Sequence, residues 1–169
     1  MNFIRILMIK IDASSLIYLL RMNFIDVLVK FENELVITKA VHDEVVIRGK
    51  NKGRADAFIC EKLIHEGRIT VHDHLGYMLN VNLGPGEQET IQNAMEKQCS
   101  CVLDDQKALR MATSMGVAVK QVPFLMLEAL KKNVISSIEF DAYFKKWVHH
   151  ADPPAELHQL IKSMKELLA

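Results

Sequence analysis

The chain has 169 residues, of which 50% are hydrophobic and 25% are charged, as in a soluble globular domain with a sizeable core. Lysine plus arginine and aspartate plus glutamate both number 21, so the net charge is zero. Bulk charge therefore gives no argument for nucleic-acid binding, although it does not exclude a local basic patch beside a local acidic site.

The cysteine content argues against a disulfide framework. Three cysteines, Cys60, Cys99 and Cys101, are few and odd in number, which favours a reducing, cytoplasmic setting. Cys99 and Cys101 form a lone C-x-C without a second pair at zinc-site spacing, so we expect both to be buried strand residues.

The amino terminus is apolar enough to suggest a signal peptide. Arg5, Lys10 and Asp12 interrupt the apolar run, however, and no small-residue cleavage site follows it. Because no uninterrupted apolar segment is long enough to cross a bilayer, we expect a cytoplasmic protein without a membrane partner.

Short apolar runs alternate with segments of helical periodicity along most of the chain. Thr38 is a predicted helix N-cap, and the last helix is opened by Pro153 and Pro154. In chain order the predicted elements are strand 4–11, helix 15–29, strand 35–37, helix 38–45, a polar loop at 48–54, helix 55–65, strand 68–71, helix 87–97, strand 100–103, helix 105–115, strand 117–119, and helices 123–132, 137–149 and 154–168.

This alternation predicts the fold class. Strands that are separated by helices form a mostly parallel sheet covered on both faces, which is a three-layer α/β/α sandwich. We expect residues 1–135 to form this domain. Residues 136–169 are expected to be a C-terminal helical extension, whose apolar stripes pack on the core or on a partner.

Acidic residues are predicted where ligands bind in such a sheet, outside the carboxyl ends of its strands. The acids that four separate segments deliver to this rim are Asp12, Glu44, Glu87 and the pair Asp104/Asp105. Each has a purely structural alternative: Asp12 and one of the paired aspartates can cap helices, Glu87 can interact with its helix dipole, and Glu44 can be a solvated side chain.

Convergent carboxylates repel one another unless they share protons or bind a cation. Oxygen ligands with few histidines or cysteines nearby favour Mg²⁺ or Mn²⁺ over Zn²⁺. A site of this kind suits the hydrolysis of phosphodiester bonds.

Four segments in this order resemble the PIN domain, particularly its VapC-like branch: IKIDASSLI, ITKAVHDEVV, GPGEQETIQNA and CVLDDQKALRMA. The resemblance covers roughly residues 6–135 and implies a Mg²⁺- or Mn²⁺-dependent endoribonuclease, often the toxin of a toxin–antitoxin pair. By position it implies metal-binding, catalytic roles for Asp12, Glu44, Glu87 and Asp105, with Asp104 as the companion of Asp105, and a supporting role for Ser14. The segment KQVPF departs from the family's usual Gly-Thr-like loop.

Candidate RNA contacts are basic. The predicted loop RGKNKGR carries four cations and no acid, Arg48, Lys50, Lys52 and Arg54, and is either an RNA-backbone contact or a solvated loop. Arg110 either binds phosphate or pairs with an acid. His72 and His74 are expected to be surface loop residues rather than metal ligands.

The leading hypothesis is a PIN-type endoribonuclease that is silenced by a small antitoxin protein and forms a homodimer. The alternative is a catalytically silent PIN fold that binds RNA or regulates a partner. The acids argue against this alternative, whereas KQVPF and the neutral charge favour it. Phosphotransfer classes are disfavoured, because a haloacid-dehalogenase-like phosphatase needs an aspartate where Ser14 stands and a receiver carries its acid pair on the early strand.

Overall fold

The computed structural model describes residues 8–32, 34–73, 76 and 81–168. Across these residues, five strands form one sheet in the order β3-β2-β1-β4-β5, and every neighbouring pair is parallel. The strands are β1 (Met8–Ile11), β2 (Glu34–Thr38), β3 (Thr70–His72), β4 (Ser100–Val102) and β5 (Val119–Lys120). The predicted α/β fold with a parallel sheet is confirmed.

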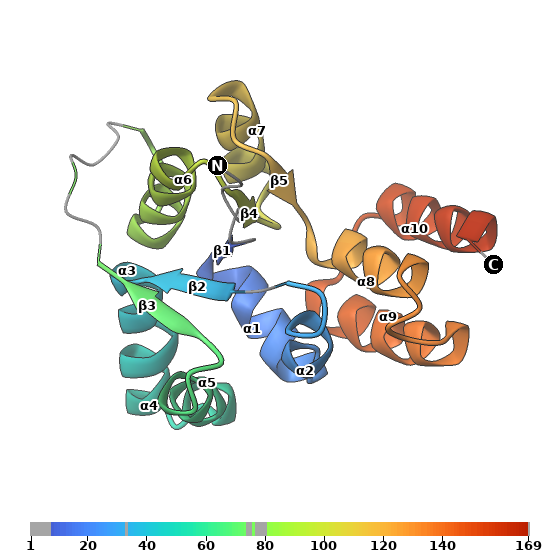
Figure 1. Cartoon of the computed structure of the whole chain (residues 1–169), viewed down its shortest axis with the longest axis horizontal. Coiled ribbons are helices and arrows are strands. Elements are labelled where there is room, and N and C mark those ends of the chain that lie inside the picture. Colours follow the sequence, from blue (N-terminus) through green and yellow to red (C-terminus); the bar gives the residue numbers. More distant parts are fainter. Residues whose placement is uncertain (1–7, 33, 74–75, 77–80, 169) are drawn as a thin grey trace, which may run out of the picture.

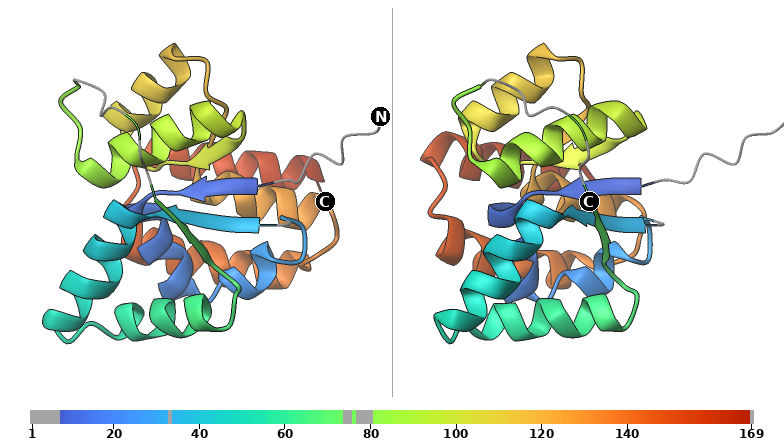
Figure 2. Two further views of the ribbon diagram at one scale, coloured as in Figure 1. Left: turned by 60° about the vertical axis from the view of Figure 1, so that its left-hand side comes forward. Right: turned by 90° about the vertical axis from the view of Figure 1, so that its left-hand side faces the viewer.

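Helices cover both faces of this sheet, with α6 and α7 on one face and α1 on the other (Figures 1 and 2). The helices are α1 (Ala13–Met22), α2 (Ile25–Leu28), α3 (Lys39–His42), the π-helical segment η1 (Asp43–Ile47), α4 (Arg48–Asn51), α5 (Ala55–His65), α6 (Pro85–Lys97), α7 (Gln106–Ser114), α8 (Val122–Lys131), α9 (Ser137–Ala151) and α10 (Ala155–Leu168).

The two faces bury separate hydrophobic cores. Ile9 and Ile11 of β1 belong to the larger core, which also contains residues of α1, α8 and α9. Cys101 of β4 belongs to the smaller core, with Ile91 of α6 and Ala108 of α7. This alternation along the strands is what a sheet covered on both faces requires.

The central strands bring two acids to one edge. β1 and β4 are neighbours, with Ile11 aligned to Val102. The backbone N–H of Asp12 continues the ladder by donating to the Val102 carbonyl at 3.3 Å. Asp12 and the aspartates that follow β4 therefore leave the sheet side by side, at its carboxyl edge.

Several predicted elements differ in detail. The expected helix over 15–29 is divided into α1 and α2, because Asn23 adopts a left-handed conformation with φ of +62° that ends α1. The strand expected over 4–11 is seen as β1, and residues 4–7 of that prediction lie outside the described residues. Cys101 is buried as expected, whereas Cys99 precedes β4 and is only half-buried.

The prediction of a loop over 48–54 is wrong for its first half. Helical structure runs without interruption from Lys39 through η1 to Asn51, so only residues 52–54 connect α4 to α5. Gly49 is the buried position of α4 and faces Ala57 of α5, while Arg48, Lys50 and Asn51 are at least partly exposed. A short helix with a single small buried residue shows almost no hydrophobic periodicity, which explains the incorrect prediction.

The C-terminal helices join the larger core. Phe140, Phe144 and Trp147 of α9 are buried in it, and the ring centroids of Phe144 and Trp147 are 5.7 Å apart. α9 packs against α1 and α8, and α10 packs against α8. Among the described residues, no helix has the length and apolar character to cross a membrane. The expected domain boundary at residue 135 stays a prediction.

Gly49→Ala is expected to destabilise the protein. A Cβ atom at this position would lie 2.8 Å from the Cβ of Ala57, and such overpacking outweighs the gain in helix propensity, leaving a net loss of about 1–2 kcal/mol. Urea unfolding measures the free energy of unfolding. The control Asn51→Ala, on the exposed side of α4, should leave it nearly unchanged, and adding Ala57→Gly should partly rescue Gly49→Ala. A neutral Gly49→Ala variant would contradict the packing of α4 on α5.

Candidate functional site

Asp12 combines a structural role with a place at the sheet edge. It is the N-cap of α1: its Oδ1 accepts a hydrogen bond from the backbone N–H of Ser15 at 2.9 Å, and its Oδ2 accepts one from the Ser14 hydroxyl at 3.0 Å. The residue is 1% exposed. The capping alternative is therefore real, and it orients the carboxylate. Ser14 thus helps to orient the Asp12 carboxylate, while its supporting role at a metal site stays a prediction.

The two adjacent aspartates diverge. Asp105 is exposed and caps α7, because its Oδ1 accepts from the backbone N–H groups of Lys107 and Ala108, both at 2.9 Å. Asp104 turns inward, and its Oδ1 accepts from the N–H of Val122 at the start of α8, at 3.1 Å. The structure thus makes Asp105 the helix cap and places Asp104 beside Asp12.

The second oxygen of Asp104 is unpaired. Asp104 Oδ2 is buried and makes no close hydrogen bond to a described residue, although the Ser15 side chain is near enough to lower the pKa of this carboxyl. A buried carboxylate oxygen without a partner is costly, because burial removes its hydration without replacing it. Among the predicted acids, this atom is the clearest indication that the edge of β1 and β4 is arranged to receive a ligand.

The pKa values of both acids reflect their enclosure. Burial, with the charge of Asp12 as the next cause, raises the pKa of Asp104 to about 7, and hydrogen bonds from the Val122 N–H and the Ser15 side chain oppose this rise. Burial raises the pKa of Asp12 to about 6, hydrogen bonds from Ser15 and Ser14 oppose this rise, and the charge of Glu87 adds to it. Without a cation the Asp12–Asp104 pair therefore keeps a proton near neutral pH.

Glu87 in the first turn of α6 and Glu44 of η1 both lie near the start of α6. Glu87 Oε2 accepts from the backbone N–H of Gly84 at 2.9 Å, so this carboxylate closes a capping box. Glu44 is exposed, and its Oε2 would lie 3.5 Å from a Cβ at Gly86. The tighter contact is with Val41 Cγ2, 3.3 Å from such a Cβ, so the glycine lets α3 approach the first turn of α6. Glu44 sits within the π-helical segment, a type of irregularity that is frequent at functional sites.

Glu89 was not predicted as a site residue, and it fixes this arrangement. Its Oε2 accepts from the backbone N–H of Ala40 at 2.9 Å, which ties α6 to the first turn of α3. Because α3 continues into η1, this bond also helps to set where Glu44 lies. The only sign of this role in the sequence is that Glu89 is the second glutamate of GPGEQE. From sequence alone, an acid that binds a helix N-terminus cannot be told from a solvated one.

The predicted acids meet only in part. Within the residues that the structure describes, no three histidine, cysteine or acidic side chains are gathered closely enough to hold a metal ion as they stand. Asp12 and Asp104 form a pair, Glu87 is engaged as a cap, and Glu44 flanks it. The donor set nevertheless fits Mg²⁺ or Mn²⁺, because it consists of carboxylate oxygens and includes the buried, unpaired Oδ2 of Asp104.

The predicted basic cluster is partly neutralised. Lys50 pairs with Glu61 at 2.7 Å, and Arg54 pairs with the buried Asp56 at 2.6 Å. Arg48 and Lys52 are exposed on and just after α4. Arg110 is exposed on α7, where it lines a cavity of about 520 Å³ that also includes Asp105 and Lys107. An RNA-binding role for these cations stays a prediction.

His72 lies in β3 and not in a loop. Its Nδ1 is 2.9 Å from the Nζ of Lys10, and its Nε2 is 3.8 Å from an oxygen of Glu34. Lys10 is fully buried, and this burial lowers its pKa to about 8. The histidine is therefore a partner of a buried cation. His74 lies outside the described residues.

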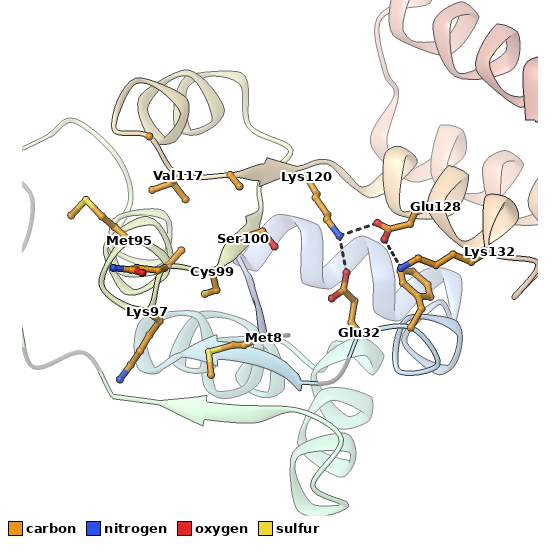
Figure 3. Close-up of a pocket in the computed structure, with 15 residues that line it drawn as sticks. Met8, Glu32, Met95, Lys97, Cys99, Ser100, Val117, Lys120, Glu128 and Lys132 are labelled. Carbon is orange, nitrogen blue, oxygen red and sulfur yellow. Dashed lines mark hydrogen bonds and ion pairs between the residues drawn. The ribbon is translucent and has the colours of Figure 1, made fainter. Parts of the chain in front are cut away.

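A further cavity lies at the opposite edge of the sheet. It measures about 770 Å³ and is lined by residues at the amino ends of β1 and β4, including Met8 and Ser100 (Figure 3). Lys120 crosses it to contact Glu32 at 2.8 Å and Glu128 at 2.9 Å. None of the predicted acids lines it, and ligands of open parallel sheets bind at the other edge.

The paired acids predict a pH-dependent stability. Their folded-state pKa values lie above that of an unfolded aspartate, so the folded protein binds more protons and loses stability as the pH rises from about 4 to 7. In the presence of EDTA, Asp104→Asn should remove most of this loss, up to about 4 kcal/mol, because each unit of raised pKa corresponds to about 1.4 kcal/mol. The measurement is thermal unfolding at acidic and mildly alkaline pH. Histidines contribute equally to the pH dependence of both proteins, so the difference between variant and wild type reports on the aspartates. Identical pH profiles would show that the pair is not coupled.

Comparison with known proteins identifies the family of this chain. A PIN domain family model, DUF3368, matches residues 8–142. A PilT N-terminus domain protein from the archaeon Sulfolobus solfataricus P2 is 19% identical with a TM-score of 0.53, over 73% of this chain and 93% of that chain. A domain of a functionally unknown Methanocaldococcus jannaschii protein is 18% identical with a TM-score of 0.48, over 68% and 89% of the two chains. No curated protein matches. The chain therefore belongs to the PIN domain family, whose fold is of the nuclease type.

Proposed function

We propose that the protein is a divalent-metal-dependent endoribonuclease whose active site is built on Asp12 and Asp104. The observation that carries this proposal is the pair of enclosed carboxylates at the carboxyl edge of β1 and β4, in which Asp12 is buried and Asp104 Oδ2 is buried without a close hydrogen-bond partner among the described residues. A scaffold would gain stability by replacing one of these acids with an amide. Membership of a family with a nuclease-type fold agrees with the proposal.

The chain's own residues prepare the site. Asp12 and Asp104 would hold Mg²⁺ or Mn²⁺, with Glu87 and Glu44 as further ligands. Asp105 is the weakest candidate ligand, because its carboxylate already caps α7. When bound, the metal supplies charge neutralisation for the phosphodiester and activation of the attacking water. Ser14 and the N–H of Ser15 keep the Asp12 carboxylate oriented, and the N–H of Val122 does the same for Asp104.

The biological setting is proposed from the family resemblance. A toxin held inactive by a small antitoxin, a cytoplasmic location and a homodimeric assembly all agree with the proposed activity. RNA is the proposed substrate. The toxin role, the location, the dimer and the RNA substrate are all proposed in addition to the nuclease-type fold.

One observation favours a second candidate function, a catalytically silent PIN fold that binds RNA or regulates a partner. Glu87 is engaged in its capping box, and no three potential ligands are gathered among the described side chains. Calorimetry with Mn²⁺ discriminates between the two candidates. Absence of binding at millimolar metal would favour the silent protein.

Adjacent aspartates provide a matched test of activity. Asp104→Asn and Asp12→Asn should lower Mn²⁺-dependent cleavage of single-stranded RNA by about a hundredfold or more, because each removes a charged ligand. Asp105→Asn should stay within a few-fold of wild type, since asparagine also caps helices. Cleavage is followed by gel electrophoresis, with EDTA as the blank. Equal residual cleavage by wild type and Asp12→Asn would refute the site.

Metal binding is measurable without turnover. At mildly alkaline pH, saturating Mn²⁺ should stabilise the wild-type protein by about 2–3 kcal/mol when its concentration is a hundred times the Kd. Asp104→Asn should show little of this stabilisation, while Asp105→Asn should keep most of it. Thermal unfolding with and without EDTA gives the comparison. A full Mn²⁺ effect in Asp104→Asn would place the metal elsewhere.

A further inference from the structure

One face of α1 leads from the acids toward solvent. Ser14, Tyr18 and Arg21 recur at spacings of four and three residues, which places them on the same side of the helix. Ser14 binds Asp12, Tyr18 is half-buried, and the Arg21 side chain is 40% exposed. With a rise of about 1.5 Å per residue, this face extends about 14 Å from Asp12 to Arg21.

Tyr18 lies between the acids and the arginine. Burial raises the pKa of its phenol, the charges of Asp104 and Asp12 add to that rise, and the charge of Arg21 opposes it. All three charges thus act on one hydroxyl group. The ring packs in part against the larger hydrophobic core, and its exposed part lies on the same face of α1 as Ser14, a place the sequence did not single out because Tyr18 occupies an ordinary helical position.

A buried acid holds two arginines at the far end of this face. The Asp56 side chain in α5 is 5% exposed; it binds Arg54 through two hydrogen bonds, at 2.6 and 3.2 Å, and contacts Arg21 at 3.4 Å. Since one carboxylate neutralises one guanidinium, the trio keeps a net positive charge. Both arginine side chains are partly exposed, at 40% and 31%, so they retain donors for a further anion.

This trio is more than a link between two helices. One arginine would be enough to neutralise Asp56 and to link α5 to α1. The second arginine adds a partly exposed positive charge. α1 packs against α5 and against α9, so that its remaining face is bounded by these two helices (Figure 1). Arg54 is also close enough to Glu44 for that acid's charge to act on it, which connects this end with the acidic rim.

We infer that Tyr18, Arg21 and Arg54 form the track along which a single-stranded RNA reaches the Asp12–Asp104 pair. The guanidinium groups bind backbone phosphates, and the Tyr18 ring stacks on an unpaired base. The inference rests on the proposed function and names its substrate contacts. It moves the main RNA contact from Lys50 of α4, which has Glu61 to itself, to α1 and the neighbouring Arg54, where two arginines share the single carboxylate of Asp56.

Binding of a fluorescently end-labelled single-stranded RNA, measured by anisotropy in EDTA, tests the track without cleavage. Tyr18→Leu should raise the Kd about tenfold, and Tyr18→Phe should restore it because the ring is kept. Arg21→Gln should raise the Kd and lower the slope of its salt dependence by about 0.7, as expected for one lost phosphate contact on a single strand. Arg54 still neutralises Asp56 in this variant, so the fold is retained; circular dichroism verifies this.

The control Lys162→Gln removes an exposed cation from α10, away from the track, and should bind RNA like wild type. The track is refuted if Tyr18→Leu and Arg21→Gln bind as wild type does, or if Lys162→Gln loses as much affinity as they do. Wild-type cleavage in Mn²⁺ together with unaffected binding by the variants would refute the track alone. Track-dependent binding without any Mn²⁺-dependent cleavage would refute the nuclease assignment alone.

Discussion

The burial of two carboxylates at the ends of adjacent parallel strands is the constraint on which the rest of the site depends. Asp12 and Asp104 follow β1 and β4, and the register of these strands leaves them no room to separate. Each is held by backbone N–H donors at the start of a helix, α1 for Asp12 and α8 for Asp104. Helix N-termini partly offset the repulsion, but they leave Asp104 Oδ2 without a partner.

The surrounding elements are arranged around this pair. Gly86 lets α3 approach α6 closely, and Glu89 holds α3 to α6, so that Glu44 and Glu87 both lie near the start of α6. On the other face of the sheet, α1 carries Tyr18 and Arg21 away from the acids toward the guanidinium of Arg54. Negative charge is thus concentrated at the end of the strands, and positive charge is held beside it by the buried Asp56.

The sequence was sufficient for the fold and for the positions of the acids, but not for their partners. Alternating apolar runs and helical periodicity identify a parallel α/β sheet, because burial on both faces leaves a strong pattern. The pattern fails where burial involves one small residue, as at Gly49 in α4. Whether Asp104 or Asp105 turns inward depends on which helix N-terminus each carboxylate reaches, and the α8 N-terminus is distant in sequence. The pairing of Lys50 with Glu61 and of Arg54 with Asp56 likewise required the packing of α4 on α5.

The raised pKa values of the acid pair also bear on how long the chain survives in a cell. A protein whose site opposes its own folding near neutral pH spends more time unfolded, and unfolded chains are the ones that proteases remove. Any cation that binds between Asp12 and Asp104 shifts that balance toward the native state by mass action. Occupancy of the proposed site by a cation would therefore add to the stability of the native state and lower the fraction of unfolded chain that proteases can reach.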